Sequence, residues 1–344
     1  MAATTYNNTT ATRLATGSIE TPIVALAFSY AVATFGHCTA GATIKLTCNS
    51  KTISVVMDGN GNASVSLLPF IKDDMATRNV LEHPIAGLTT NNMRGQLSIA
   101  VSRQNSDTTD VTVSVFYIYG DCAPKAVYST QQWCDLNDDS DNYSPIYLDL
   151  ASNYTSGVPN TLAAFLGCWA NGSTLTPFYD GMVYTCIRFY GDKIVQDNIT
   201  FRVNTDCRVM PSIRRVRWID SNGNLHCRKL VFAAESESGA VGDSYQRPHD
   251  VKALIGGGGY YDRGSDTWAN ITATRQVTLG DESIPIERFD DLKEIATSPI
   301  VEMYENGAWS RCNVTGFAVE RDPRKAAFQL TVTLQAPTYT VQEF

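Results

Sequence analysis

The sequence contains no hydrophobic run long enough to cross a membrane. The apolar stretch at residues 23–35 is too short for a bilayer span and is interrupted by Ser29, Tyr30 and Thr34. Residues 1–10 have no basic segment followed by an apolar core, so we expect no secretory signal. These absences favour a protein that folds in the cytoplasm of the cell that makes it.

Paired cysteines are also missing, although the chain of 344 residues has nine cysteines. Without a Cys-x-x-Cys arrangement, a zinc site of the thiolate type, a redox pair or an iron–sulfur cluster is not expected. A chain of this length can bury a hydrophobic core without a disulfide framework. The cysteines are therefore expected to be buried free thiols.

The common catalytic signatures are absent. There is no Gly-x-Ser-x-Gly and no His-Glu-x-x-His, and the four glycines at 256–259 lack the Gly-Lys-Ser/Thr ending of a phosphate-binding loop. Ser244 and His37 resemble protease motifs superficially, but Tyr245 follows the serine where a glycine should stand. We predict that the chain is not an enzyme.

Strong positive charge is lacking too. The net charge is −8. The local exception is Arg208 with Arg214, Arg215 and Arg217, and the last three fall on a predicted strand, which places alternate side chains on opposite faces. Because nucleic-acid binding needs a continuous basic surface, we expect no direct nucleic-acid binding.

What the sequence does contain is β-strand patterning. Residues 52–57 and 63–68 flank Asp58-Gly-Asn-Gly and are predicted to form a hairpin, and residues 109–119 alternate between apolar and polar side chains. Residues 21–120 show a β pattern throughout, which is typical of a β-sandwich. We predict a mainly β protein with tandem β-sandwich-like domains and a C-terminal β domain that carries one short helix.

The predicted organisation has four parts. Residues 1–18 are an extended N-terminal arm, 19–120 a β-sandwich domain, 121–207 a second β domain, and 208–344 a C-terminal β scaffold domain. The last of these is expected to contain a hairpin at 213–232, a mobile loop at 235–266 and the short helix near 287–297.

One stretch has the spacing of a calcium-binding loop. Asp135, Asn137, Asp139 and Asp141 alternate as oxygen ligands do in such loops. The sixth position is Ser140 instead of glycine, and the position of the bidentate glutamate is occupied by Ile146. The motif is incomplete, so a solvated acidic turn is the stronger interpretation, with calcium as the alternative. No other cofactor is expected.

Three aromatic residues indicate a binding surface. Tyr260, Tyr261 and Trp268 lie in or beside the polar, glycine-rich loop, where large rings need something to pack against. The partner could be another subunit or a glycan, and a small core within the loop is an equal alternative.

The closing part of the chain resembles the end of tail-tip or baseplate proteins of phages that infect Bacteroides-type gut bacteria. The residues that carry the resemblance are Arg275-Gln-Val-Thr-Leu, Leu292-Lys-Glu-Ile-Ala-Thr-Ser-Pro-Ile-Val-Glu-Met-Tyr, Gly-Ala-Trp309 and Phe328-Gln-Leu-Thr-Val-Thr-Leu. Two further stretches are similar to the same group: Arg217-Trp-Ile-Asp-Ser-Asn-Gly and Gly61-Asn-Ala-Ser-Val-Ser-Leu-Leu-Pro-Phe.

The resemblance implies a structural protein of a virion tail, of distal-tail or hub type, made in the host bacterial cytoplasm. It implies a homo-oligomeric ring that contacts other phage tail proteins, in which the arm and the 235–266 loop become ordered on neighbouring subunits. The alternative is a receptor- or glycan-binding module on a virion or cell surface, and an enzyme ranks third.

Overall fold

The structure is a computed structural model. The residues that it describes are 4–78, 93–104, 109–120, 131–137, 146–150, 154–155, 158–159, 165–167, 181–206, 212–220, 223, 225–240, 244–246, 254–255, 259–260, 266–268, 271–321, 324, 326–336 and 339–342.

The C-terminal domain is a closed antiparallel β-barrel with one short helix, which confirms the predicted mainly β class and the predicted helix. The ring of pairings closes because β25 pairs back onto β18 and β19 pairs with β24. Around the barrel the order is β18 (Ile213–Ile219), β19 (Leu225–Ala240), β24 (Ile271–Pro285), β27 (Ala327–Gln335), β26 (Ala308–Arg321) and β25 (Val301–Glu305).

Strand β27 shows how alternation along a strand supplies the barrel core. On β27 the side chains of Phe328, Leu330, Val332 and Leu334 are buried, and the residues between them are partly or fully exposed. A 3-10 turn, η2 (Ile286–Arg288), leads into the helix α2 (Phe289–Thr297). The apolar side of α2 joins the same core through Leu292 and Ile295.

The N-terminal domain is a two-layered sandwich. One sheet has the order β2 (Thr9–Arg13), β3 (Ser18–Pro22), β5 (Val32–Gly36) and β8 (Ala63–Ser66). The other has the order β4 (Val24–Leu26), β10 (Val111–Ile118), β9 (Arg94–Arg103), β6 (Thr43–Cys48) and β7 (Lys51–Val56). A single core fills the space between the two sheets, with Ile19 and Phe35 from the first packing with Leu46, Ile99 and Val115 from the second.

Within the described residues, two expectations for residues 21–120 are wrong. The segments on either side of Asp58-Gly-Asn-Gly do not form a hairpin, because β7 pairs with β6 in one sheet and β8 pairs with β5 in the other. The second wrong expectation is that of a continuous strand pattern. Residues 68–77 form a helix, α1 (Leu68–Thr77). Pro69 stands at the start of α1, where its missing N–H costs no hydrogen bond, and Phe70, Ile71 and Met75 are buried. Ile71 and Met75 are four residues apart, so both lie on the helix face that covers the sandwich core.

The middle of the chain adds a third sheet, and the N-terminal segment takes part in it. This sheet has the order β1 (Thr4–Asn7), β17 (Lys193–Asp206), β16 (Val183–Tyr190), β12 (Ile146–Leu150) and β15 (Phe165–Gly167), with β11 (Gln131–Asn137) parallel to β17. The segment expected to be an arm is extended, but its pairing partners lie in the same chain: β1 pairs with β17, and β2 pairs with β3. The expectation that a neighbouring subunit is needed to order these residues is thus corrected.

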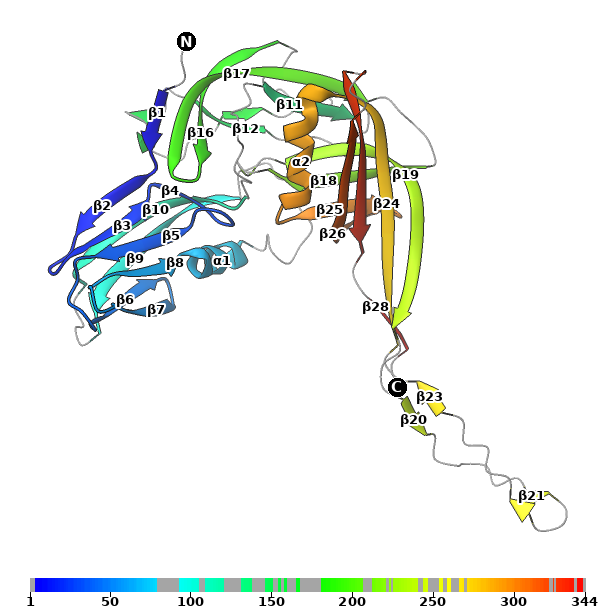
Figure 1. The fold of residues 1–344 in the computed structure, drawn as a ribbon, viewed down its shortest axis with the longest axis horizontal. Coiled ribbons are helices and arrows are strands. Elements are labelled where there is room, and N and C mark those ends of the chain that lie inside the picture. The colour runs from blue at the N-terminus through cyan, green and yellow to red at the C-terminus, as the bar shows by residue number, and fades with distance from the viewer. Residues whose placement is uncertain are drawn as a thin grey trace.

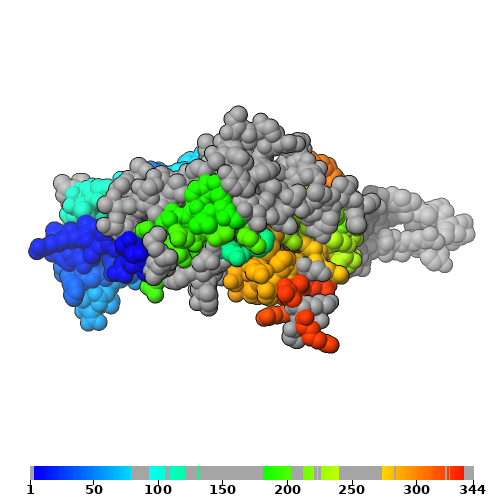
Figure 2. All heavy atoms as spheres, turned by 90° about the horizontal axis from the view of Figure 1, so that it is seen from above, coloured from blue at the N-terminus to red at the C-terminus, as the bar shows by residue number. Residues whose placement is uncertain are grey.

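The three sheet systems are joined by shared packing. Ile219 at the end of β18 and Ile300 before β25 belong to the sandwich core, and Val24 and Ile118 of the sandwich pack on Phe189 and Ile194 of the middle sheet. Figure 2 shows the sandwich and the barrel at different places along an elongated molecule, with β16 and β17, in green, between them.

Two barrel strands continue far beyond the barrel as an arm (Figure 1). Residues 232–240 of β19 pair with residues 272–279 of β24, of which 276–279 also pair with β27 in the barrel, so the arm proper begins at the pair Glu237 and Arg275. Strand β28 (Tyr339–Gln342) pairs with β24 near the outer end. Residues 235–240, expected to begin a loop, are therefore strand. Short pairs follow farther along: β20 (Ser244–Gln246) with β23 (Asp266–Trp268), and β21 (Leu254–Ile255) with β22 (Gly259–Tyr260).

Among the described residues, no helix is both long enough and apolar enough to cross a membrane.

Candidate functional site

A group of ionisable residues, three of them buried and one partly buried, lies where the β18–β19 hairpin meets α2. We call it the His226 cluster; its members are Asp220, His226, Asp291 and Glu294. Asp220 directly follows β18, His226 is the second residue of β19, and the two carboxylates of α2 are three residues apart and so share one face of the helix. His226 and Asp220 are 3% and 2% exposed.

His226 faces a carboxylate on each side of its ring. Its Nε2 lies 3.1 Å from Oδ2 of Asp220 at hydrogen-bond distance, and its Nδ1 lies 3.7 Å from Oδ1 of Asp291. Burial alone would lower the pKa of His226. The hydrogen bond with Asp220 and the negative charges of Asp291, Asp220 and Glu294 outweigh burial and raise that pKa to about 9.

Further contacts hold the cluster in place. Trp218 pairs with His226 across the hairpin, and the two rings stack with centroids 5.3 Å apart. Arg288 donates from Nη2 to Oδ2 of Asp291 at 2.7 Å and lies over the ring of Trp133, which belongs to β11. The hairpin turn reaches the sandwich at Gly223, where an added Cβ would lie 3.3 Å from Met93 and Ile118. The cluster therefore sits where the barrel, the sandwich and the middle sheet meet.

The arrangement of the cluster suits a small ion. One ring nitrogen of His226 and carboxylate oxygens of Asp220 and Glu294 all lie within 4.8 Å of one another, and all three residues are buried. Such an enclosed set of donors can hold a proton or a metal ion, whereas a substrate of any size needs an open approach.

The chain matches no protein-family model and no curated protein.

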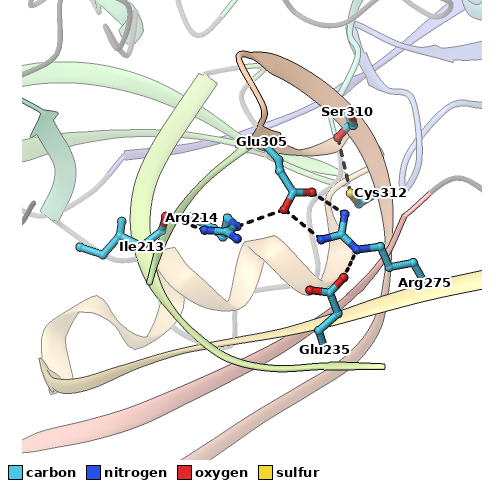
Figure 3. Close-up of polar contacts among 7 residues, drawn as sticks. All are labelled: Ile213, Arg214, Glu235, Arg275, Glu305, Ser310 and Cys312. Atoms are coloured by element: carbon cyan, nitrogen blue, oxygen red, sulfur yellow. Dashed lines mark hydrogen bonds and ion pairs between the residues drawn. The ribbon is translucent and has the colours of Figure 1, made fainter. Parts of the chain in front are cut away.

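A second group of charges lies at the base of the arm (Figure 3), and we call it the arm-root cluster: Arg214, Glu235, Arg275 and Glu305. Arg275 of β24 donates from Nη2 to Oε1 of Glu305 at 2.9 Å, and through its other nitrogens to Glu305 and to Glu235 of β19. Nε of Arg214 lies 3.4 Å from Oε1 of Glu305.

The charges of the arm-root cluster stabilise one another. The hydrogen bonds from Arg275 hold the pKa of Glu305 below its usual value, and the same bonds raise the pKa of Arg275. Because the four residues come from β18, β19, β24 and β25, the cluster ties the base of the arm to the barrel wall and sets the direction in which the arm leaves.

From this root outward, one side of β19 has no pairing partner among the described strands. Residues 233–239 of β19 are exposed, and among the described strands they pair only with β24. We call these residues the open edge. A strand edge of this kind presents backbone N–H and C=O groups to any strand that aligns with it.

The predicted calcium ligands are only partly described. Asp135 and Asn137 lie on β11, in register with Asn204 and Asp206 of β17, so this part is a strand and not the expected loop. Asp139 and Asp141 fall outside the described residues. Calcium binding stays a prediction.

The predicted aromatic surface is likewise untested. Tyr260 is in register with Leu254 in the β21–β22 pair, and Trp268 is in register with Ser244 in the β20–β23 pair. Tyr261 falls outside the described residues.

The His226 cluster was not predicted from the sequence. The hairpin at 213–232 and the helix near 287–297 were each predicted, but not that they meet. The available signal was the hairpin register, which places Trp218 opposite His226. Nothing local shows that α2, far along the chain, returns to the same place.

Proposed function

We propose that this chain is a structural component of a phage virion tail, of ring, distal-tail or baseplate hub type, that acts by self-assembly. Self-assembly is supported by the arm, which projects from a closed barrel and has an open edge. The resemblance of the closing residues to tail-tip and baseplate proteins supports the virion part.

The open edge supports assembly because natural proteins rarely leave a strand edge without a purpose. Edges are usually covered, shortened or charged, since they would otherwise pair with other chains. Glu235 and Glu237 supply charge along this edge, which disfavours indiscriminate pairing but still permits pairing with a complementary strand.

The geometry favours a contact between two different surfaces of neighbouring subunits. An arm that points away from its own barrel reaches a surface unlike itself, and such head-to-tail contacts form closed rings when the rotation permits. The arm-root cluster keeps the arm at a fixed angle to the barrel, which repeated identical contacts require. In this role the chain needs no catalytic residue and no nucleic acid.

Electron microscopy and light scattering of the full chain test the proposal. We expect discrete rings or oligomers that dissociate on dilution, because the arm of each subunit is bound by the next.

Two proline variants locate the contact. Backbone N–H groups alternate between the two sides of a strand, so Ser236→Pro and Glu237→Pro remove donors from opposite sides of β19. We expect one variant to abolish oligomers without loss of fold and the other to lower the melting temperature by breaking the pairing with β24. Wild-type protein that stays monomeric at high concentration and binds glycans would instead favour the receptor-binding alternative.

A further inference from the structure

The donor set of the His226 cluster leads to a second proposal, independent of the assembly role. We propose that Asp220, His226 and Glu294 bind one divalent transition-metal ion, with Zn²⁺ the ion that best fits one imidazole nitrogen and two carboxylates in a closed site. The role of the ion is structural: it joins α2 to the β18–β19 hairpin.

The first argument is the convergence of the donors. Their ligand atoms lie within 4.8 Å of one another, and the three residues come from the end of β18, the start of β19 and the middle of α2. Asp220, His226 and Glu294 are 2%, 3% and 7% exposed, so bulk water does not compete strongly for the same oxygens and nitrogen.

The second argument is the support around the histidine. A histidine that binds a metal usually donates its other ring N–H to a carboxylate, which fixes the tautomer and orients the ring. Here Asp291 lies 3.7 Å from Nδ1, an ion-pair distance that is longer than a hydrogen bond, and Arg288 holds Asp291 at 2.7 Å, while Nε2 is directed at Asp220. Metal binding displaces the proton shared by Nε2 and Asp220, which passes to solvent.

A third observation is independent of the cluster's own hydrogen bonds. Within the described part of the chain, the indole N–H of Trp218 is buried without a hydrogen-bond partner, although its ring stacks on His226. Buried donors are nearly always satisfied, so an acceptor is expected near this ring, and a water held by the ion is one such acceptor.

Isothermal titration of the metal-free full chain with Zn²⁺ tests the site. After treatment with EDTA and dialysis, we expect uptake of one Zn²⁺ per chain and a melting temperature that rises with Zn²⁺ concentration. Folded wild-type protein that takes up neither Zn²⁺ nor Co²⁺ in a one-to-one ratio would overturn the proposal and leave the cluster as a buried imidazolium with carboxylate partners.

Substitutions that keep the size of the side chain but remove its charge then distinguish metal ligands from supporting residues. We expect Asp220→Asn and Glu294→Gln to weaken Zn²⁺ binding by about 100-fold or more, and Asp291→Asn to weaken it by about 10- to 100-fold. The matched control is Asp281→Asn, because Asp281 is also a buried carboxylate of the barrel but pairs with Arg228 outside the cluster. Unchanged affinity in both ligand variants would contradict the assignment.

A measurement on unaltered residues covers the case in which these variants fail to fold. The chain has four histidines, so paramagnetic Co²⁺ should shift or broaden the ring signals of one of them in the NMR spectrum of otherwise wild-type protein. Replacing His37, His83 and His249 by Gln, singly, identifies the other three signals. Co²⁺ that affects any of those three, and not His226, places the ion elsewhere.

Discussion

In the Asp58–Asn62 turn of the sandwich, neighbouring residues differ in how much space surrounds them and in the backbone conformation that they need. Oδ1 of Asp58 accepts hydrogen bonds of 2.8 Å from the backbone N–H groups of Asn60 and Asn62. Gly61 has φ +74°, and a Cβ added there would lie 1.9 Å from the carbonyl oxygen of Cys38. Gly59 stands two residues earlier with nothing within 4 Å of an added Cβ.

The two glycines therefore give a matched pair of variants. Gly61→Ala should lower the free energy of unfolding by about 2 kcal/mol or more, because it combines a left-handed backbone with a backbone clash. Gly59→Ala should change it by less than about 0.5 kcal/mol. Urea unfolding of both variants measures the difference, and equal losses would mean that the close approach to Cys38 does not exist.

At the scale of secondary-structure elements, ion pairs join the strands at the base of the arm. Arg275 makes contact with both β19 and β25, so the base of the arm is held from two sides. The pKa of Glu305 is lowered chiefly by its hydrogen bonds with Arg275. Since the folded pKa is below the unfolded value, ionised Glu305 stabilises the fold above the unfolded pKa, and this stabilisation is lost as pH falls through the folded pKa.

This sign gives a pH prediction for the arm root. At pH 7 Glu305→Gln should unfold at a lower urea concentration than wild type. This difference in urea midpoint, which we call the gap, should disappear as the pH falls below about 4.3, the ordinary pKa of glutamate. Glu320→Gln, an exposed position on β26, should show no gap at any pH. A gap that persists to pH 2 would show that the Gln variant is weakened by something other than the lost charge.

The elements also show where sequence patterns suffice. The hairpin of β18 and β19 was predictable because Asp-Ser-Asn-Gly-Asn marks its turn, and α2 because acidic residues precede a helical apolar spacing. The outer part of β19 was not, because Glu235-Ser-Glu-Ser-Gly239 has little β-propensity and is a strand only through its pairing with β24. Helix α1 was missed because it is short and follows strands. The His226 cluster depends on tertiary contacts between distant segments, which no local pattern encodes.

At the scale of the whole molecule, one buried asparagine connects two of the sheet systems. Asn8 is 0% exposed. Its Nδ2 donates to the carbonyl oxygens of Val24 and Gly191, each at 2.8 Å, and its Oδ1 accepts from the N–H of Val24 at 2.9 Å. These bonds link the first strands to the sandwich and to the β16–β17 turn.

Asn8→Ala should therefore destabilise the chain by about 3 kcal/mol, since it leaves several buried backbone groups without partners. We also expect the middle sheet to unfold separately from the sandwich, seen as two transitions by calorimetry where we expect one transition for the wild type. Asn60→Ala, an exposed asparagine, is the control and should leave the profile unchanged. A single unaltered transition in Asn8→Ala would mean that apolar packing alone couples the two sheets.

The pairing of β1 with β17 has a consequence for synthesis on the ribosome. Residues 4–7 emerge first, yet their partner strand is residues 193–196, so β1 must wait for more than half of the chain. At about 5–20 residues per second this wait is on the order of 10–40 s. During that time the sandwich can fold, but β1 stays without its partner, and nascent chains that stop before β17 should be the ones most prone to aggregate.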